Sequence, residues 1–184
     1  MQRTAPKRVD PQIALDPLRF VFGGVAFDVC PTRELKWALT DEHRGFLAGY
    51  ATSPVAGLVH CSVSVASELA DDHRREIEWS WDGDVAQIAT GRLRAELRWL
   101  GGSRYAARAQ VAPGSCGCTS VCTAIAAAVV SHRGGLVLHA AGIELDGRAV
   151  LFIGPSGAGK TTTANHCKGA RWMARDRAAI YPTP

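Results

Sequence analysis

The chain reads Gly154-Pro155-Ser156-Gly157-Ala158-Gly159-Lys160-Thr161 at the point that decides the fold of its C-terminal part. This stretch completes the pattern G-x-x-x-x-G-K-[ST], whose glycines let the backbone turn its N–H groups toward a phosphate. Lys160 can set its ammonium against the terminal phosphates, and the Thr161 hydroxyl can ligate Mg²⁺. The pattern predicts a phosphate-binding loop, formed by Gly154, Ser156, Gly157, Ala158, Gly159, Lys160, Thr161 and Thr162.

The flanks of this loop have the order that such a loop needs, a strand before it and a helix after it. Residues 149–153 are a continuous apolar run, which is typical of a strand covered on both faces. Residues 161–168 read as a short helix that ends before Gly169. Another strand, 136–145, precedes the turn Asp146-Gly147, so we expect an antiparallel hairpin directly before the loop.

The first half of the chain alternates apolar and polar residues, the pattern of strands with one covered face. We expect a β-meander, with strands near 59–65, 76–81, 92–99 and 105–111 and tight turns at Asp82-Gly83 and Gly101-Gly102. A largely apolar helix follows at 119–132. The predicted organisation is a flexible basic tail over 1–18, a β-rich region over 19–112 and a phosphate-loop domain over 113–184.

Composition narrows the class of protein. The 184 residues are 47% apolar with a net charge of +4, and the basic residues are spread along the chain, which argues against a nucleic-acid partner. No apolar run is long enough for a membrane span or a secretory signal. Six cysteines without an export signal favour a cytoplasmic protein with reduced thiols. The spacing Cys116-Gly-Cys118 with Cys122 fits a zinc site poorly, and free thiols are the favoured interpretation.

Three segments together resemble the HPr serine kinase/phosphorylase family, and more closely the HPr-kinase-related bacterial proteins. They are Leu136-Val137-Leu138-His139-Ala140-Ala141-Gly142, Asp146-Gly147-Arg148, and Leu151-Phe152-Ile153 with the loop that follows. The resemblance implies a phosphoenolpyruvate-carboxykinase-like nucleotide fold. The expected class is α/β (α+β overall), with the β-rich region and a helix preceding an incomplete nucleotide domain that stops after its third strand.

The resemblance also implies site residues and a reaction. It places His139 near the phosphates and Asp176 in the metal site with Thr161, and it implies ATP and Mg²⁺ as ligands. His139 has a simpler interpretation as a strand histidine with a satisfied hydrogen bond. Where the family carries a first aspartate this chain has Arg175, which cannot act as a general base but could pair with phosphate.

The implied function is transfer of the terminal phosphate of ATP to a protein serine, and the family often forms homo-oligomers. The alternative is a nucleotide-binding regulatory module, or a truncated product, with little or no transfer. An enzyme acting on a small molecule is a third possibility, for which no substrate residues are visible. A GTPase is least favoured, because the chain lacks an N-K-x-D segment.

Overall fold

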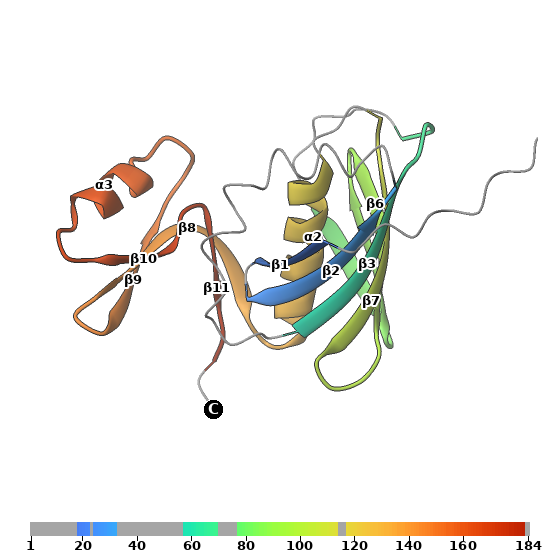
Figure 1. Ribbon diagram of the computed structural model, residues 1–184, viewed down its shortest axis with the longest axis horizontal. Helices are drawn as coiled ribbons and strands as arrows, with labels where there is room; N and C mark the ends of the chain where they lie inside the picture. Colours follow the sequence, from blue (N-terminus) through green and yellow to red (C-terminus); the bar gives the residue numbers. More distant parts are fainter. Residues whose placement is uncertain (1–17, 23, 33–56, 70–76, 114–116, 183–184) are drawn as a thin grey trace, which may run out of the picture.

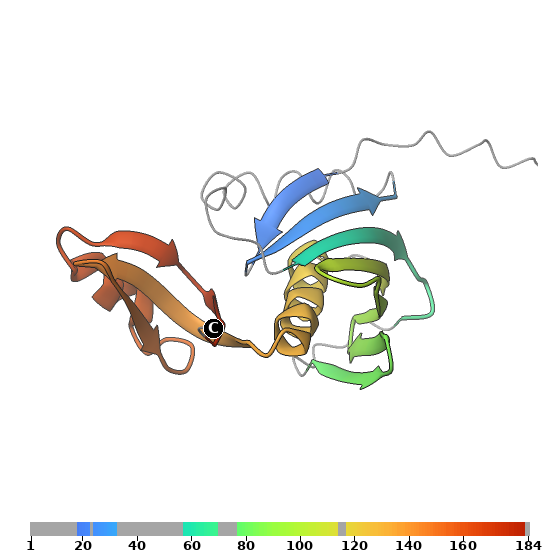
Figure 2. The same ribbon diagram turned by 90° about the horizontal axis from the view of Figure 1, so that it is seen from below.

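The computed structural model describes residues 18–22, 24–32, 57–69, 77–113 and 117–182. It contains a seven-stranded sheet, a four-stranded sheet, a long helix α2 and a short helix α3. Figures 1 and 2 show α2 lying against the larger sheet, while the smaller sheet and α3 extend to one side. The expected strand-rich mixed α/β class is confirmed, although this arrangement does not establish a carboxykinase-like nucleotide domain.

The larger sheet has the strand order β1-β2-β3-β7-β6-β5-β4. Its strands are β1 (Leu18–Phe22), β2 (Val25–Pro31), β3 (Gly57–Val65), β4 (Glu78–Asp82), β5 (Val85–Thr90), β6 (Leu93–Trp99) and β7 (Arg104–Val111). The predicted meander is right for β4, β6 and β7, but it missed β5, which lies between β4 and β6 and pairs antiparallel with both. It is wrong for β2, β3 and β7, which pair in parallel. Parallel neighbours need a long crossover connection, which a period of two along the sequence does not reveal.

The core of the molecule lies between this sheet and α2 (Gly117–His132). Val59, Leu97 and Tyr105 of the sheet meet Ile125 and Val129 of the helix, and all five are fully buried. The helix is apolar on nearly all sides because the smaller sheet covers part of it, through its half-buried Val137 and Ala179. Helix α2 thus packs on the larger sheet, and the predicted domain boundary at residue 113 stays a prediction.

The smaller sheet is built around one strand, β8 (Leu136–Leu145). Strand β9 (Arg148–Ile153) pairs with one edge of β8, and β10 (Arg171–Ala174) and β11 (Arg177–Ile180) pair with the other edge in succession. All three partners are antiparallel to β8, so the predicted hairpin before the loop is confirmed. Helix α3 (Lys160–His166) packs on one face of this sheet, where Ala164 is buried with Ala141 and Ile143.

Strand β9 differs from the expectation of a strand covered on both faces. It is an edge strand, its residues are exposed or half-buried, and Ile153 is 64% exposed. An apolar run shows that a segment can be buried, but α3 covers only one face here. Neither helix in the described part of the chain has the length and apolar character needed to cross a bilayer. The expected cytoplasmic localisation stays a prediction.

Candidate functional site

The phosphate-loop pattern lies between β9 and α3, in the predicted order of strand, loop and helix. Gly157 and Gly159 have φ angles of 82° and 81°, in the left-handed region that side-chain-bearing residues rarely adopt. Both glycines are therefore required by the backbone path of the loop itself. Gly159 is also the N-cap residue of α3 and provides no side-chain capping bond. As in any α-helix, the first backbone N–H groups of α3 have no partner within the helix, and Gly159 has no side chain to satisfy them.

Lys160 folds its side chain back across the loop. Its Nζ donates hydrogen bonds to the carbonyl oxygens of Gly154 and Pro155, each at 2.8 Å. A lysine ammonium has three N–H donors, so one donor remains after these two bonds. The loop's own backbone therefore holds the Lys160 ammonium beside the carbonyl groups of Gly154 and Pro155.

The hydroxyl groups of the loop and of the first turn of α3 are divided between two roles. Thr163 donates its hydroxyl to the carbonyl oxygen of Gly159 at 3.0 Å, which ties the first turn of α3 to the loop. Ser156, Thr161 and Thr162 are all exposed. The hydroxyls at 156, 161 and 162 therefore lie on the surface of the predicted binding loop and can reach a bound ligand.

His139 and Asp176, two residues far apart in sequence, form an ion pair. The distance from His139 Nε2 to Asp176 Oδ1 is 3.0 Å, and the two side chains are 44% and 59% exposed. Arg177 Nε lies 3.5 Å from the other carboxylate oxygen. The pairing follows from β10 and β11 sharing one edge of β8, because the backbone N–H of Ala140 donates to the Asp176 carbonyl at 3.0 Å.

The strand register brings this pair to the loop end of the sheet. Ala140 lies opposite Ile153, the last residue of β9, so His139 and Gly154 continue the same two neighbouring strands. Adjacent strands are about 4.8 Å apart, which places the His139 backbone beside the start of the loop. Residues alternate between the faces of β8, so His139 shares the face of Ala141, on which α3 packs. The register therefore places the His139 backbone next to the start of the loop, with Asp176 on the other edge of β8, and the catalytic role of both residues stays a prediction.

The Arg175 side chain lies over an aromatic ring. Its guanidinium carbon lies 5.1 Å from the centre of the Trp172 ring, a cation–π contact. The sequence analysis considered Arg175 as a partner for phosphate, and that role stays a prediction, since the structure gives this side chain an aromatic neighbour instead.

The donor set at the loop suits Mg²⁺ in combination with a ligand. Among the described residues there is no group of three or more His, Cys, Asp or Glu that could hold a metal by itself. Thr161 and Asp176 offer hard oxygen donors, and Mg²⁺ typically takes one or two protein ligands together with substrate phosphates and waters. Cys122 is buried in the core. The side chains of Cys116 and Cys118 lie outside the described part of the chain.

Comparison with known proteins corrects the expected family. A family model described as SynChlorMet cassette protein ScmC matches residues 117–182, which include α2, the smaller sheet and the loop. This is the stretch on which the resemblance to the HPr serine kinases was based, and no match to that family supports it, so that assignment is wrong. The ScmC match covers less than half of the chain. The curated proteins and the solved structures compared with this chain give no match.

Proposed function

We propose that residues 154–161 bind the phosphates of a nucleoside triphosphate, with ATP as the first candidate. The observation that carries the proposal is the loop itself. Gly157 and Gly159 supply the left-handed backbone, and Lys160 is held across the loop by two carbonyl oxygens. A glycine-rich turn that matched the pattern by chance would not need its lysine in that position.

Each part of the loop has a distinct task in this proposal. Backbone N–H groups of the loop and of the first turn of α3 hydrogen-bond to phosphate oxygens. Lys160 contributes a positive point charge, and Thr161 would hold Mg²⁺ against the phosphates. When bound, Mg²⁺ neutralises charge on the phosphate oxygens.

Phosphoryl transfer to a hydroxyl group is the second candidate, and the ion pair of His139 and Asp176 favours it. Asp176 would accept the proton of the acceptor hydroxyl as that oxygen bonds to the terminal phosphorus. The bond from this phosphorus to the bridging oxygen breaks, and the nucleoside diphosphate leaves. His139, 3.0 Å from the carboxylate, would orient it. The acceptor would be a protein serine, or water in a slow hydrolysis; a module that only binds nucleotide would show neither reaction.

Thermal unfolding with and without Mg²⁺ and ATP tests the binding proposal. Ligand at about 100 times its Kd should stabilise the fold by about 2.7 kcal/mol, a rise of roughly 5–10 °C in Tm for a chain of this size. Lys160→Ala should abolish most of this rise. Lys168→Ala, the same substitution at an exposed lysine outside the loop, is the matched control and should keep it. A wild-type Tm that ATP does not change at millimolar concentration would reject the proposal.

A further inference from the structure

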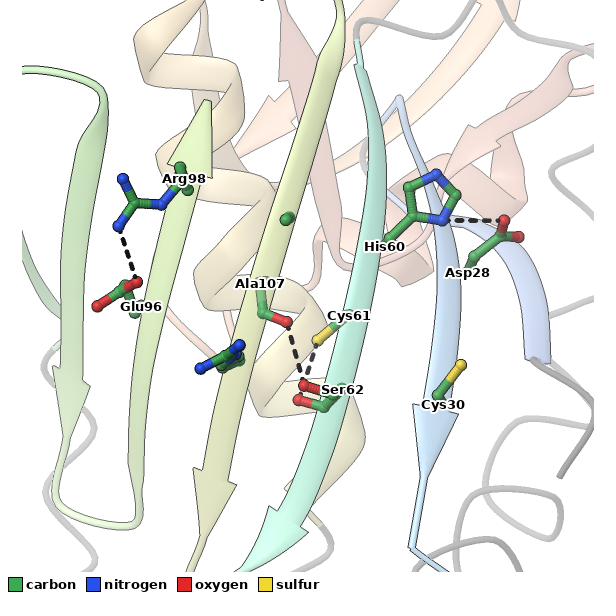
Figure 3. Close-up of a pocket in the computed structure, with 10 residues that line it drawn as sticks. Asp28, Cys30, His60, Cys61, Ser62, Glu96, Arg98 and Ala107 are labelled. Atoms are coloured by element: carbon green, nitrogen blue, oxygen red, sulfur yellow. Dashed lines mark hydrogen bonds and ion pairs between the residues drawn. The ribbon is translucent and has the colours of Figure 1, made fainter. Parts of the chain in front are cut away.

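The larger sheet carries a hollow of about 530 Å³ on the face turned away from α2. Figure 3 shows this hollow, whose lining residues come from the four neighbouring strands β2, β3, β7 and β6. Small side chains form its floor: Cys30, Ser62 and Ala106. These residues alternate along their strands with the buried residues of the core, so the hollow lies on the opposite face of the sheet.

Positive charge dominates one side of this hollow. Strands β6 and β7 turn four arginines to this face, against one acid, Glu96. Arg98 and Arg108 line the hollow with Glu96, and Arg94 and Arg104 flank it on the same face. Glu96 is paired with Arg98, since its Oε1 lies 3.4 Å from Arg98 Nη2. Within the described ranges, none of the other three arginines has an ion pair, so this half of the face carries a surplus of three positive charges.

The opposite side of the hollow is close to neutral. Asp28 Oδ2 lies 3.3 Å from His60 Nδ1, and its other carboxylate oxygen lies 3.0 Å from Arg19 Nε. Figure 3 shows His60 and Asp28 pointing toward each other across β2 and β3. Further acids on this face, Glu78 and Asp82, belong to β4 at the far edge of the sheet. The unpaired charge is therefore concentrated over β6 and β7.

We propose that this hollow binds an extended acidic peptide segment, whose alternate residues carry the carboxylates. The arginines stand in successive rows of the antiparallel pair: Arg94 opposite Gln110, Glu96 opposite Arg108, and Arg98 opposite Ala106. Rows are two residues apart, about 6.7 Å, which is the spacing of same-side side chains in an extended chain. A guanidinium also binds a carboxylate through two parallel hydrogen bonds.

The chemistry of the face favours a peptide over a single-stranded nucleic acid. Nucleic-acid strands bind to sheets that offer exposed aromatic rings on which bases stack. Here Tyr105 is fully buried in the core, and Trp81 and Trp99 pack against His132 on the helix side. The volume of the hollow is within the range of ligand-binding clefts, about 300–1,000 Å³.

Fluorescence anisotropy with a labelled peptide Glu-Ser-Glu-Ser-Glu-Ser tests this inference independently of nucleotide binding. The peptide should bind, more tightly at low salt, and a Gln-Ser peptide should not. Arg94→Ala and Arg108→Ala should each weaken binding about tenfold, which is typical of losing a hydrogen bond to a charged group. The double variant carrying Arg94→Glu and Arg108→Glu should abolish it. Arg148→Glu, at an exposed arginine of β9 in the other sheet, is the matched control and should bind as wild type does.

Several results would overturn the inference. Equal binding by wild type and the double variant would place the peptide elsewhere, provided that both proteins have the same Tm. Equal binding of a peptide with three glutamates in succession and then three serines would contradict the alternating spacing, and this comparison uses only the wild-type protein. If oligothymidylate at an equal concentration displaces the acidic peptide, the ligand of this face is a nucleic acid and the peptide proposal is wrong.

Discussion

Asp176→Asn separates a catalytic role of the His139 ion pair from a structural one. The substitution removes the charge of the carboxylate and keeps its size, leaving the 3.0 Å contact with His139 without an anion. Because the two side chains are 44% and 59% exposed, the pair contributes little to folding. Exposed pairs are worth about 0–1 kcal/mol, so we expect the Tm to fall by no more than about 4 °C.

Turnover should respond far more strongly than stability. If Asp176 accepts the proton of the acceptor, its loss should slow release of phosphate from labelled ATP by about 10²–10⁴-fold. Glu144→Gln is the matched control. Glu144 lies on β8 and is also paired with an arginine, Arg171 of β10, but it is at the end of β8 away from the loop. Equal turnover by the two variants would refute a catalytic role for Asp176. Absence of turnover in the wild type would reject phosphoryl transfer and leave nucleotide binding to be judged by its own test.

Two further predictions concern the fold. Gly135→Ala should destabilise the protein by about 1–3 kcal/mol, because the new Cβ would lie 2.6 Å from the Ile180 carbonyl oxygen and 2.8 Å from Val130 Cγ1. A denaturant titration measures this change, and an unchanged midpoint would contradict the prediction. Tyr105→Phe should cost about 1 kcal/mol, since the hydroxyl lies 2.9 Å from His132 Nδ1. Burial raises the pKa of Tyr105 above 10.0, against an opposing effect of Arg133. The folded state therefore keeps this proton longer than the unfolded state, and stability should fall as the pH rises above about 10. The variant should lose part of that alkaline dependence, and an identical pH profile would show that another group causes it.

The sequence predicted best those parts of the fold that depend on neighbouring residues. The turn Asp146-Gly147 and the alternation of β6 and β7 are local signals, and they placed the β8–β9 hairpin and most of the meander. The contact between His139 and Asp176 is different in kind. It requires β10 and β11 to share one edge of β8, which no local pattern indicates, and only a resemblance suggested that the two residues act together. The arginines over β6 and β7 all fall within residues 94–108, and the antiparallel pairing of the two strands sets them side by side on one face.

The parallel pairing of β3 with β7 has a consequence for how the chain folds. Strand β3 ends at Val65, but its inner neighbour in the finished sheet begins only at Arg104. The ribosome therefore releases β1, β2 and β3 well before the strand that completes them, and their edge stays open until the meander has emerged. Folding with such distant partners is slow, because the chain loses the conformational entropy of closing a long loop before the contacts between the strands stabilise it. The β8–β9 hairpin, joined by two residues, needs no such wait and should be among the earliest native structure to form.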